Sequence, residues 1–438
     1  MRYFEMKFGR PRGTKDFLPD EMRVRQYIIR KIKDTFELHG FEEMDTPAIE
    51  LWEVLSAKGG EEVERQIYKF QDKGGRWIGL RFDLTVPLAR VVASNPNLVK
   101  PFKRYCISKV WRYEEPQSGR LREFLQADID IVGSARMEAD MECISTAVDA
   151  LKSLELEGFE VRINNRKILE GMMESLAIPP EVSMRVFRTL DKIEKIGEEN
   201  VSKELEKIGL NTEVICEILS FIHNQGSEAL DHAEGRFGSS KLIKEGVEEL
   251  WRMIELSEPY DLEGLLKVDF SLVRGLDYYT GPVFEIKVKD AQIGSVAGGG
   301  RYDSLIEKFG GGPTPATGIS LGIERLYEVL NQRIRKVLSP SETVIFIANT
   351  SAEVLPDAIR LRERLIKQGI VAETDLMGRK LGRQLEYANS KKIPYVLIVG
   401  PEELQTGVFK LRDMANKKEF SVKFEDVPFT ILGKHTTK

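Results

Sequence analysis

The sequence predicts an α+β protein with a strand-rich body, a helical middle part and a C-terminal α/β unit. Residues 102–133 hold two apolar, β-branched runs on either side of Pro116-Gln117-Ser118-Gly119, a pattern typical of a β-hairpin. Residues 165–267 carry apolar side chains at helical spacing. From residue 343 onward, strand and helix patterns alternate, which indicates a small unit with a largely parallel sheet.

Length and composition describe a globular protein of several parts. The 438 residues suggest two or three domains, and 42% hydrophobic beside 31% charged residues gives an ample core. No apolar run reaches the roughly 18 residues of a membrane helix, and the first residues lack the apolar region of a signal peptide. We therefore expect a cytoplasmic protein with no membrane partner.

Cysteine and histidine are too scattered for the commonest metal and nucleophile sites. Cys106, Cys143 and Cys216 fit neither a disulfide framework nor a zinc site, which favours buried reduced thiols. None of the four histidines lies in a pattern typical of a metal cluster or a Ser/His/Asp triad. We predict no metal site from Cys or His, so the chemistry falls to Arg, Asp, Glu and Tyr.

The N-terminal part predicts a long helix followed by a strand. Apolar positions at helical spacing indicate a helix at about residues 21–38, with Asp20 as its N-cap and Gly40 after its end. Residues 40–47 then favour a strand that enters Pro47, a residue expected at a sheet edge.

Two polar residues, Asp83 and Thr85, follow an apolar strand and precede a helix expected to start near Pro87. The structural explanation is that Thr85 caps this helix while Asp83 pairs with Arg81.

The hairpin carries charges that a plain hairpin would not need. Arg112, Glu114 and Arg120 lie around the bend, and Asp128 and Asp130 fall among β-branched residues. Burying an unpaired charge is costly. These side chains must therefore either pair with one another or bind a charged ligand.

Two glycine-containing stretches return the chain to strand after the helical part. They read Arg-Gly-Leu-Asp-Tyr-Tyr-Thr-Gly at residues 274–281 and Ala-Gly-Gly-Gly-Arg-Tyr-Asp at residues 297–303. The glycine triplet is not a dinucleotide fingerprint, because no GxGxxG pattern leads into a helix. A strand and then a helix follow at residues 316–326, and Ser339-Pro340-Ser341 indicates a linker.

These stretches together resemble one family. Arg-x-Glu at residues 112–114 with Gly-Arg-x-Arg-Glu-Phe at residues 119–124 resembles motif 2 of class II aminoacyl-tRNA synthetases. The two glycine-containing stretches resemble the histidine-specific motifs of histidyl-tRNA synthetases. Residues 316–326 are similar to motif 3, and the helix and strand leading to Pro47 are similar to motif 1. The resemblance covers nearly the whole chain.

The family's fold follows as an expectation. It is an α+β class II catalytic domain, an antiparallel sheet flanked by helices, with a helical insertion and a C-terminal α/β anticodon-binding domain. The catalytic domain would occupy residues 1–164, with motifs 1 and 2, and residues 268–336, with the histidine-specific motifs and motif 3. The insertion would occupy residues 165–267, the linker 337–342 and the anticodon-binding domain 343–438. Motif 1 would form a homodimer interface.

The activity implied by the resemblance is that of a histidine–tRNA ligase. L-Histidine and ATP, with Mg²⁺, would give histidyl-adenylate and pyrophosphate, and the histidyl group would pass to the 3′ end of tRNA(His) with release of AMP. The basic C-terminal part, with 16 Lys and Arg against 12 Asp and Glu in residues 343–438, is compatible with RNA contact. The alternative is the non-catalytic regulatory subunit of ATP phosphoribosyltransferase, which shares the catalytic fold but generally lacks the anticodon-binding domain.

The resemblance also assigns site residues. Arg112 and Arg274 would be catalytic, since fixed cations stabilise the charge that develops on phosphoryl oxygens. The residues expected to bind ATP are Arg112, Glu114, Arg120, Phe124 and Arg325. Those expected to bind histidine are Asp83, Thr85, Gln126, Asp130, Arg274, Tyr278, Tyr279 and Tyr302. The alternative for Arg274 is an ion pair with Asp277.

Selection of histidine has a simple physical requirement. A neutral imidazole offers one N–H donor and one bare nitrogen acceptor, so a selective pocket needs one acceptor and one donor. By the resemblance, Asp130 would accept from one ring nitrogen and Tyr279 would donate to the other. Asp83 and Thr85 would bind the α-amino group, since an ammonium needs several acceptors.

Overall fold

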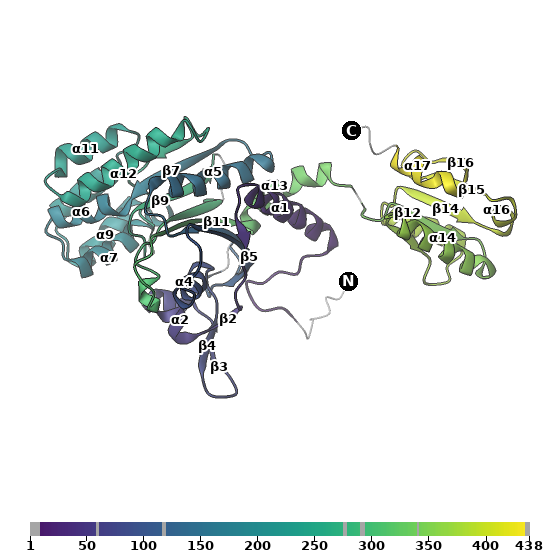
Figure 1. The fold of residues 1–438 in the computed structure, drawn as a ribbon, viewed down its shortest axis with the longest axis horizontal. Helices are drawn as coiled ribbons and strands as arrows, with labels where there is room; N and C mark the ends of the chain where they lie inside the picture. The colour runs from purple at the N-terminus through teal and green to yellow at the C-terminus, as the bar shows by residue number, and fades with distance from the viewer. Residues whose placement is uncertain are drawn as a thin grey trace. The chain divides into compact units, whose positions relative to one another are not determined.

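A computed structural model of the chain describes residues 9–57, 61–115, 120–274, 278–289, 294–339 and 341–433. The chain forms two compact units, Met1–Asn331 and Gln332–Lys438, each described by itself (Figure 1). The finer division at residues 164, 267, 336 and 342 stays a prediction.

The centre of the first unit is an eight-stranded sheet of order β1-β5-β6-β11-β10-β9-β7-β8. Every pair from β5 to β7 is antiparallel, and only the two edge pairs, β1–β5 and β7–β8, are parallel. Its strands are β1 Glu42–Glu43, β5 Phe102–Trp111, β6 Glu123–Val132, β7 Phe159–Asn165, β8 Leu266–Val268, β9 Pro282–Val288, β10 Ala297–Arg301 and β11 Ala316–Gly322. The predicted hairpin is confirmed as β5 and β6, and the predicted antiparallel sheet is confirmed as well.

The two faces of this sheet differ in character, because successive side chains of a strand point to opposite faces. One face packs on helices α1 (Pro19–Leu38) and α5 (Met137–Ser153). Tyr105 on β5 shows the contact, since its hydroxyl donates to Glu37 of α1 at 2.8 Å. The other face carries polar residues and glycines, and it forms the floor of a cavity.

The first helix begins earlier than expected. Its first residue is Pro19 and its N-cap is Leu18, whose backbone N–H donates to Glu21 at 3.3 Å. Proline suits this position because it lacks the N–H that a first helical residue leaves unpaired. The prediction of Asp20 as N-cap was therefore wrong. The strand expected at residues 40–47 is also shorter, since only Glu42–Glu43 pair with β5.

A smaller sheet of order β2-β4-β3 lies beside the main one in the first unit. Its strands are β2 Ile49–Leu51, β3 Lys69–Gln71 and β4 Trp77–Leu80, and the neighbouring helices are α2 Trp52–Ser56, α3 Glu61–Gln66 and α4 Thr85–Ser94. Helix α4 matters most for function, because Asp83 stands just before it.

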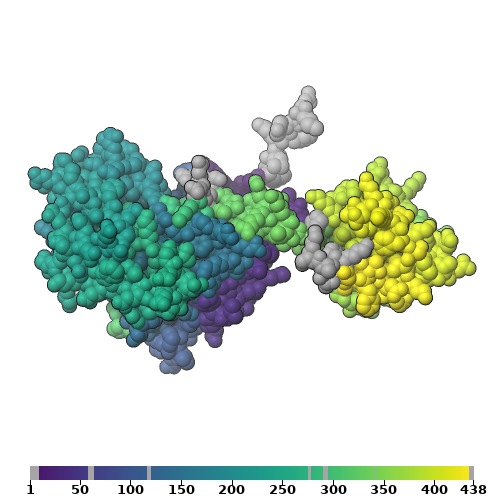
Figure 2. All heavy atoms as spheres, turned by 90° about the horizontal axis from the view of Figure 1, so that it is seen from above, coloured from purple at the N-terminus to yellow at the C-terminus, as the bar shows by residue number. Residues whose placement is uncertain are grey.

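The predicted helical part is confirmed. After β7, Asn165 caps α6 by accepting from the backbone N–H of Lys167, and six further helices follow before β8. They are α6 Arg166–Ser175, α7 Pro180–Leu190, α8 Ile193–Ile196, α9 Glu198–Ile208, α10 Thr212–Ile222, α11 Glu228–Phe237 and α12 Lys241–Ser257. Figure 1 shows these helices gathered at one end of the unit, and Figure 2 shows them as one continuous mass.

Helix α13 (Ile323–Val337) follows β11 and reaches the second unit, whose sheet has the order β13-β12-β14-β15-β16. Its strands are β12 Ile345–Asn349, β13 Ala372–Thr374, β14 Tyr395–Val399, β15 Val408–Asp413 and β16 Lys418–Lys423. Its helices are α14 Leu355–Lys367, α15 Leu381–Ser390, α16 Pro401–Thr406 and α17 Val427–Leu432. Strands β13, β12 and β14 are parallel as predicted. The prediction of a largely parallel sheet was nevertheless wrong, because β15 and β16 add an antiparallel hairpin at one edge.

The cysteines are free thiols, as expected. Cys106 and Cys143 are buried, but Cys216 is exposed, so the expectation of burial was wrong for that residue. No helix in the described ranges is long and apolar enough to cross a membrane.

Candidate active site

A cavity of about 820 Å³ opens on the polar face of the large sheet. Every site residue predicted from the sequence lines it, although these residues come from segments far apart in the chain. They are Asp83, Thr85, Arg112, Glu114, Arg120, Phe124, Gln126, Asp130, Arg274, Tyr278, Tyr279, Tyr302 and Arg325. The fold thus brings all of them together, while their individual roles stay predictions.

The glycines of β10 and β11 make room for the cavity side chains. A Cβ on Gly298 would lie 1.9 Å from Nη1 of Arg274, and one on Gly318 would lie 2.2 Å from Oδ1 of Asp130. A Cβ on Gly300 would meet the ring of Tyr279 at 2.8 Å. Two glycines of the triplet, Gly298 and Gly300, therefore leave room for cavity side chains.

Asp130 is held by two partners at the cavity floor. Nη2 of the fully buried Arg104 lies 2.7 Å from Asp130 Oδ2, and the hydroxyl of Tyr302 donates to Oδ1. Arg104 and Asp130 are cross-strand neighbours in the β5–β6 pairing. A buried charge requires such a partner, so Asp130 has a structural role in addition to any contact with substrate.

Asp83 sits at the start of α4. Its Oδ1 accepts from the backbone N–H of Val86 at 3.0 Å, while the N-cap position belongs to Leu84 and the helix begins at Thr85. Thr85 as cap was therefore wrong. Arg81 forms its ion pair with Asp45 at 3.0 Å and also donates to the carbonyl of Lys109.

Four guanidinium groups gather in another part of the cavity. Arg112 donates to the carbonyl of Phe82 at 2.9 Å and lies 5.3 Å from the ring centre of Phe124. Arg120 pairs with Glu114. Arg325 donates to the carbonyl of Ser295.

Arg274, the fourth of these cations, lies 5.7 Å from the ring centre of Tyr279, and its polar contacts with the described residues are long. Its Nη1 is 3.4 Å from the carbonyl oxygen of Phe284 and 3.8 Å from Oε2 of Glu285. Asp277, its predicted alternative partner, lies outside the described residues. Burial and the nearby cations Arg120, Arg112 and Arg274 lower the pKa of Arg325 from its usual value. Such a cluster favours an anionic ligand.

The tyrosines form a buried group on the side of Asp130. The hydroxyls of Tyr278 and Tyr279 lie 3.4 Å apart, and the ring of Tyr278 meets that of Tyr302 edge to face at 6.0 Å between centres. Burial raises the pKa of Tyr278 and of Tyr302 well above the usual value. Both hydroxyls therefore keep their protons and remain donors.

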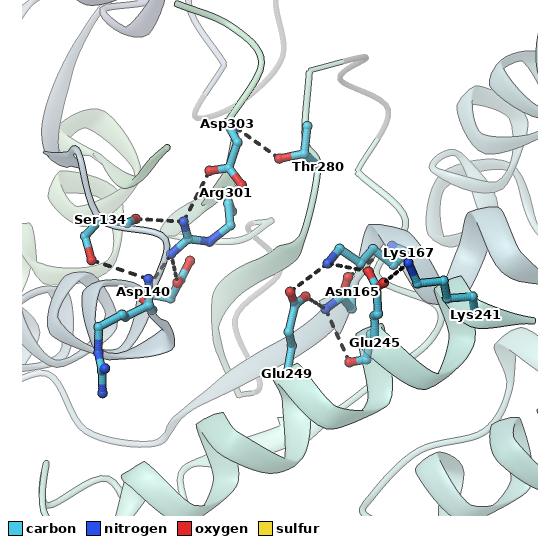
Figure 3. A network of polar contacts seen from close by, with 12 residues as sticks. Ser134, Asp140, Asn165, Lys167, Lys241, Glu245, Glu249, Thr280, Arg301 and Asp303 are labelled. Atoms are coloured by element: carbon cyan, nitrogen blue, oxygen red, sulfur yellow. Dashed lines mark hydrogen bonds and ion pairs between the residues drawn. The ribbon is translucent and has the colours of Figure 1, made fainter. Parts of the chain in front are cut away.

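Arg301, the neighbour of Tyr302, fastens this side of the cavity (Figure 3). It donates to the carbonyl of Ser134 at 2.9 Å, pairs with Asp140 and reaches Asp303 at 3.2 Å. The backbone N–H of Asp303 donates to Thr280 at 3.0 Å. A second network in Figure 3 joins the start of α6 to α12, where Lys167 pairs with Glu249 at 2.8 Å and with Glu245 at 3.1 Å.

The sequence did not identify several residues of the site. Arg104, the buried partner of Asp130, carried no motif signal. Ser320 and Glu285 line the cavity, as does the segment of α7 and α8 from Arg188 to Lys195. Asp128 lines it too, although the sequence marked it only as a charge in need of a partner or a ligand. Glu194 fixes this segment to β9 through Lys287, with 2.7 Å between Oε2 and Nζ. Helical periodicity alone gave no sign that this segment would reach the cavity.

Comparison with known proteins agrees with this geometry. The family model described as histidyl-tRNA synthetase matches residues 13–326, and that described as anticodon binding domain matches residues 342–434. The histidine–tRNA ligase of Aeropyrum pernix is 43% identical over 94% of this chain and 95% of its own length. The histidine–tRNA ligase of Pyrococcus furiosus is 40% identical over 95% of this chain and 97% of its own.

A solved structure supports the same relationship. The histidyl-tRNA synthetase of Nostoc sp. PCC 7120 superposes with a TM-score of 0.82 at 30% identity, covering 98% of this chain and all of that one. The chain therefore belongs to the histidyl-tRNA synthetase family.

Proposed function

We propose that the cavity of the first unit is the site where this histidine–tRNA ligase forms histidyl-adenylate. The main support for this proposal is that positive and negative side chains form separate groups within the cavity. Arg112, Arg120, Arg274 and Arg325 form one group, and the carboxylates of Asp83 and Asp130 belong to the other. Triphosphate suits the first group, and an amino acid with an ammonium and a polar ring suits the second.

In the first step, a carboxylate oxygen of histidine attacks the α-phosphorus of ATP. A new P–O bond forms, the bond to the β-phosphate oxygen breaks, and pyrophosphate leaves with the electron pair. Arg112 and Arg274 are the proposed catalytic residues, because two fixed cations stabilise the negative charge that develops on the α-phosphoryl oxygens. In the second step, a ribose hydroxyl at the 3′ end of tRNA(His) attacks the carbonyl carbon, and AMP leaves.

The adenine would lie on Phe124, whose ring already faces Arg112. Glu114 would accept from the adenine amino group, with Arg120 holding its carboxylate through their ion pair. Arg325 would contact the γ-phosphate, which would also relieve the repulsion among the neighbouring guanidinium groups.

Selection of histidine would depend on the buried group around Asp130. Asp130, held by Arg104, would accept from one ring nitrogen, and Tyr279 would donate to the other. Wrong amino acids would leave these buried groups unpaired, a penalty on the order of 10⁴-fold for sites of this kind. Asp83 and Thr85, with Gln126, would receive the α-ammonium.

Magnesium is proposed to arrive with ATP. No group of three or more His, Cys, Asp or Glu suited to a metal ion occurs in the part of the chain that the structure describes. The arrangement fits an ion that takes most of its oxygens from phosphates and water, as Mg²⁺ commonly does in such sites. Bound there, it would neutralise phosphate charge.

The second unit is proposed to bind the anticodon of tRNA(His), since residues 342–434 match an anticodon binding domain. This match, together with the named ligase relatives, leaves the regulatory-subunit alternative with less support. A homodimer through the motif 1 region and a cytoplasmic location remain parts of the proposal.

The decisive experiment is ATP–pyrophosphate exchange with each of the amino acids in turn. Histidine alone should support exchange, and tRNA(His) should then become charged. Exchange with a different amino acid, or none with histidine, would remove the proposed function.

A further inference from the structure

A short polar chain crosses the cavity floor from β6 to β11. The amide Nε2 of Gln126 donates to Ser320 Oγ at 2.8 Å, and the Ser320 hydroxyl lies close enough to Asp128 to lower the pKa of its carboxyl group. Asp128 and Ser320 are cross-strand neighbours in the β6–β11 pairing. Ser320 thus holds the amide end of Gln126 and stands beside the carboxylate of Asp128, so it orients the acceptor oxygens of both side chains.

Those other oxygens are open acceptors. Gln126 Oε1 and Asp128 Oδ1 are shielded from solvent and have no hydrogen-bond partner among the residues that the structure describes. Asp128 is only 4% exposed, and both side chains line the cavity. A buried carboxylate oxygen without a donor is unfavourable. A ligand in the cavity is the natural source of the missing donor.

The charge around Asp128 favours a cationic ligand group. The titratable and polar groups that face it are Arg104 and Cys106 on β5, Asp130 on β6, Ser320 on β11 and Asp83 before α4. Arg104 is engaged by Asp130, and burial raises the pKa of the Cys106 thiol to about 12, so Cys106 is neutral. Burial raises the pKa of Asp128 to about 7. The positive charge of Arg104 opposes this increase, and the negative charge of Asp130 adds to it.

We propose that Asp128 is a further histidine-binding residue, whose carboxylate accepts a hydrogen bond from the α-ammonium group; this rests on the function proposed above. An ammonium offers three donors, and Asp128 joins Asp83, Thr85 and Gln126 as a possible acceptor in the cavity lining. Ser320 is then a positioning residue, because it orients two of these acceptors. The imidazole is left to Asp130 and the tyrosines.

Binding of three ligands can show whether Asp128 contacts the ammonium group or the imidazole ring of histidine. Histidine and histidinol carry the ammonium, whereas 3-(imidazol-4-yl)propanoate lacks it but keeps the ring. In calorimetric titrations, Asp128→Asn should weaken histidine and histidinol by about tenfold or more, the scale of a lost charged hydrogen bond. Binding of the propanoate should stay within about twofold of wild type.

Two other results would overturn the inference. An equal loss for all three ligands would place Asp128 at the ring or in the fold, and no loss for any would remove it from the site. Glu50→Gln is the matched control, since Glu50 is a buried carboxylate paired with Arg90 outside the cavity, and it should leave all three affinities unchanged. Thermal unfolding of each variant shows whether it is folded.

Ser320→Ala keeps the test open if Asp128→Asn fails to fold. It removes the bridge without removing a charge, so it should weaken histidine and histidinol by a smaller factor and spare the propanoate. A loss that is equal for the three ligands, or absent, would contradict the positioning role.

The pH dependence provides an independent readout. The profile of kcat/KM reports ionisations of the free enzyme and substrate. Only ionised Asp128 can balance the ammonium, so kcat/KM for histidine should fall as pH decreases through about 7. Asp128→Asn should lack this component, whereas titration of the substrate imidazole is common to both proteins. If wild type shows exchange with histidine and the two profiles coincide, this inference fails while the proposed function stands.

Discussion

Replacing Arg274 by alanine should damage chemistry far more than folding, and the structure gives the scale of both effects. Its guanidinium has contacts of 3.4 Å to Phe284 and 3.8 Å to Glu285, longer than strong hydrogen bonds. Contacts this long are weak, so they supply only a small part of the roughly 5–15 kcal/mol that stabilises a domain. The backbone of Arg274 has φ +41°, which strains alanine as much as arginine.

The expected catalytic loss is much larger. A preorganised charge that acts on the developing oxyanion typically supplies about 10²- to 10³-fold in kcat. We therefore expect Arg274→Ala to lower kcat for adenylate formation by roughly 10²-fold or more, while the KM values for ATP and histidine change far less. Arg274→Lys should lose less, because it keeps the charge but not the planar fork.

The assay is ATP–pyrophosphate exchange, with thermal unfolding measured on the same preparations. Arg236→Ala is the matched control, because Arg236 is an exposed arginine of α11 paired with Glu217 outside the cavity. It should leave exchange unchanged. Exchange within a few-fold of wild type in folded Arg274→Ala would refute the catalytic role.

Four other predictions follow from the same structure. Asp130→Asn removes the carboxylate paired with the buried Arg104 and leaves only the more distant charge of Asp128, so denaturant unfolding should show a loss of up to about 3–5 kcal/mol; an unchanged midpoint would contradict the buried ion pair. Gly298→Ala should displace the Arg274 guanidinium and lower kcat in a folded protein, since its Cβ would lie 1.9 Å from Nη1; wild-type exchange would show that the side chain escapes at no cost. A fragment ending at Leu338 should form histidyl-adenylate yet charge tRNA poorly, and charging equal to the full chain would contradict anticodon binding by the second unit. Sedimentation at micromolar concentration should show a dimer, and a fully active monomer would remove the motif 1 assignment.

Much of the secondary structure could be predicted from the sequence, because it depends on residues that are close together in the chain. The hairpin of β5 and β6 follows from two β-branched runs around a turn, and the helices from Arg166 to Ser257 follow from apolar periodicity. The cap of α1 was misassigned because Pro19 competes with Asp20 for the helix start, and proline is favoured at the first helical position. The hairpin of β15 and β16 was missed, so the parallel character of the second sheet was overestimated.

The positions of the site residues were predicted through motifs, but their partners were not. Strand alternation places Gln126, Asp128 and Asp130 on one face, and this much is visible in the sequence. The partner of Asp130 depends on the register between β5 and β6, which sets Arg104 opposite it. Register is fixed by the whole sheet and the turn, so a sequence pattern could not identify Arg104.

The glycines of β10 and β11 show how the tertiary structure explains a sequence feature that is unfavourable by itself. The sequence contains a Gly triplet in a strand, which by itself is unfavourable because glycine loses the most freedom on folding. In the sheet, Gly298 and Gly300 lie beside Arg274 and Tyr279, and Gly318 on β11 lies beside Asp130. Each missing Cβ is the space that one cavity side chain occupies. The cost of the glycines to the strand therefore has a function, because a larger residue at any of the three positions would move a charged or polar group that is proposed to contact histidine or ATP.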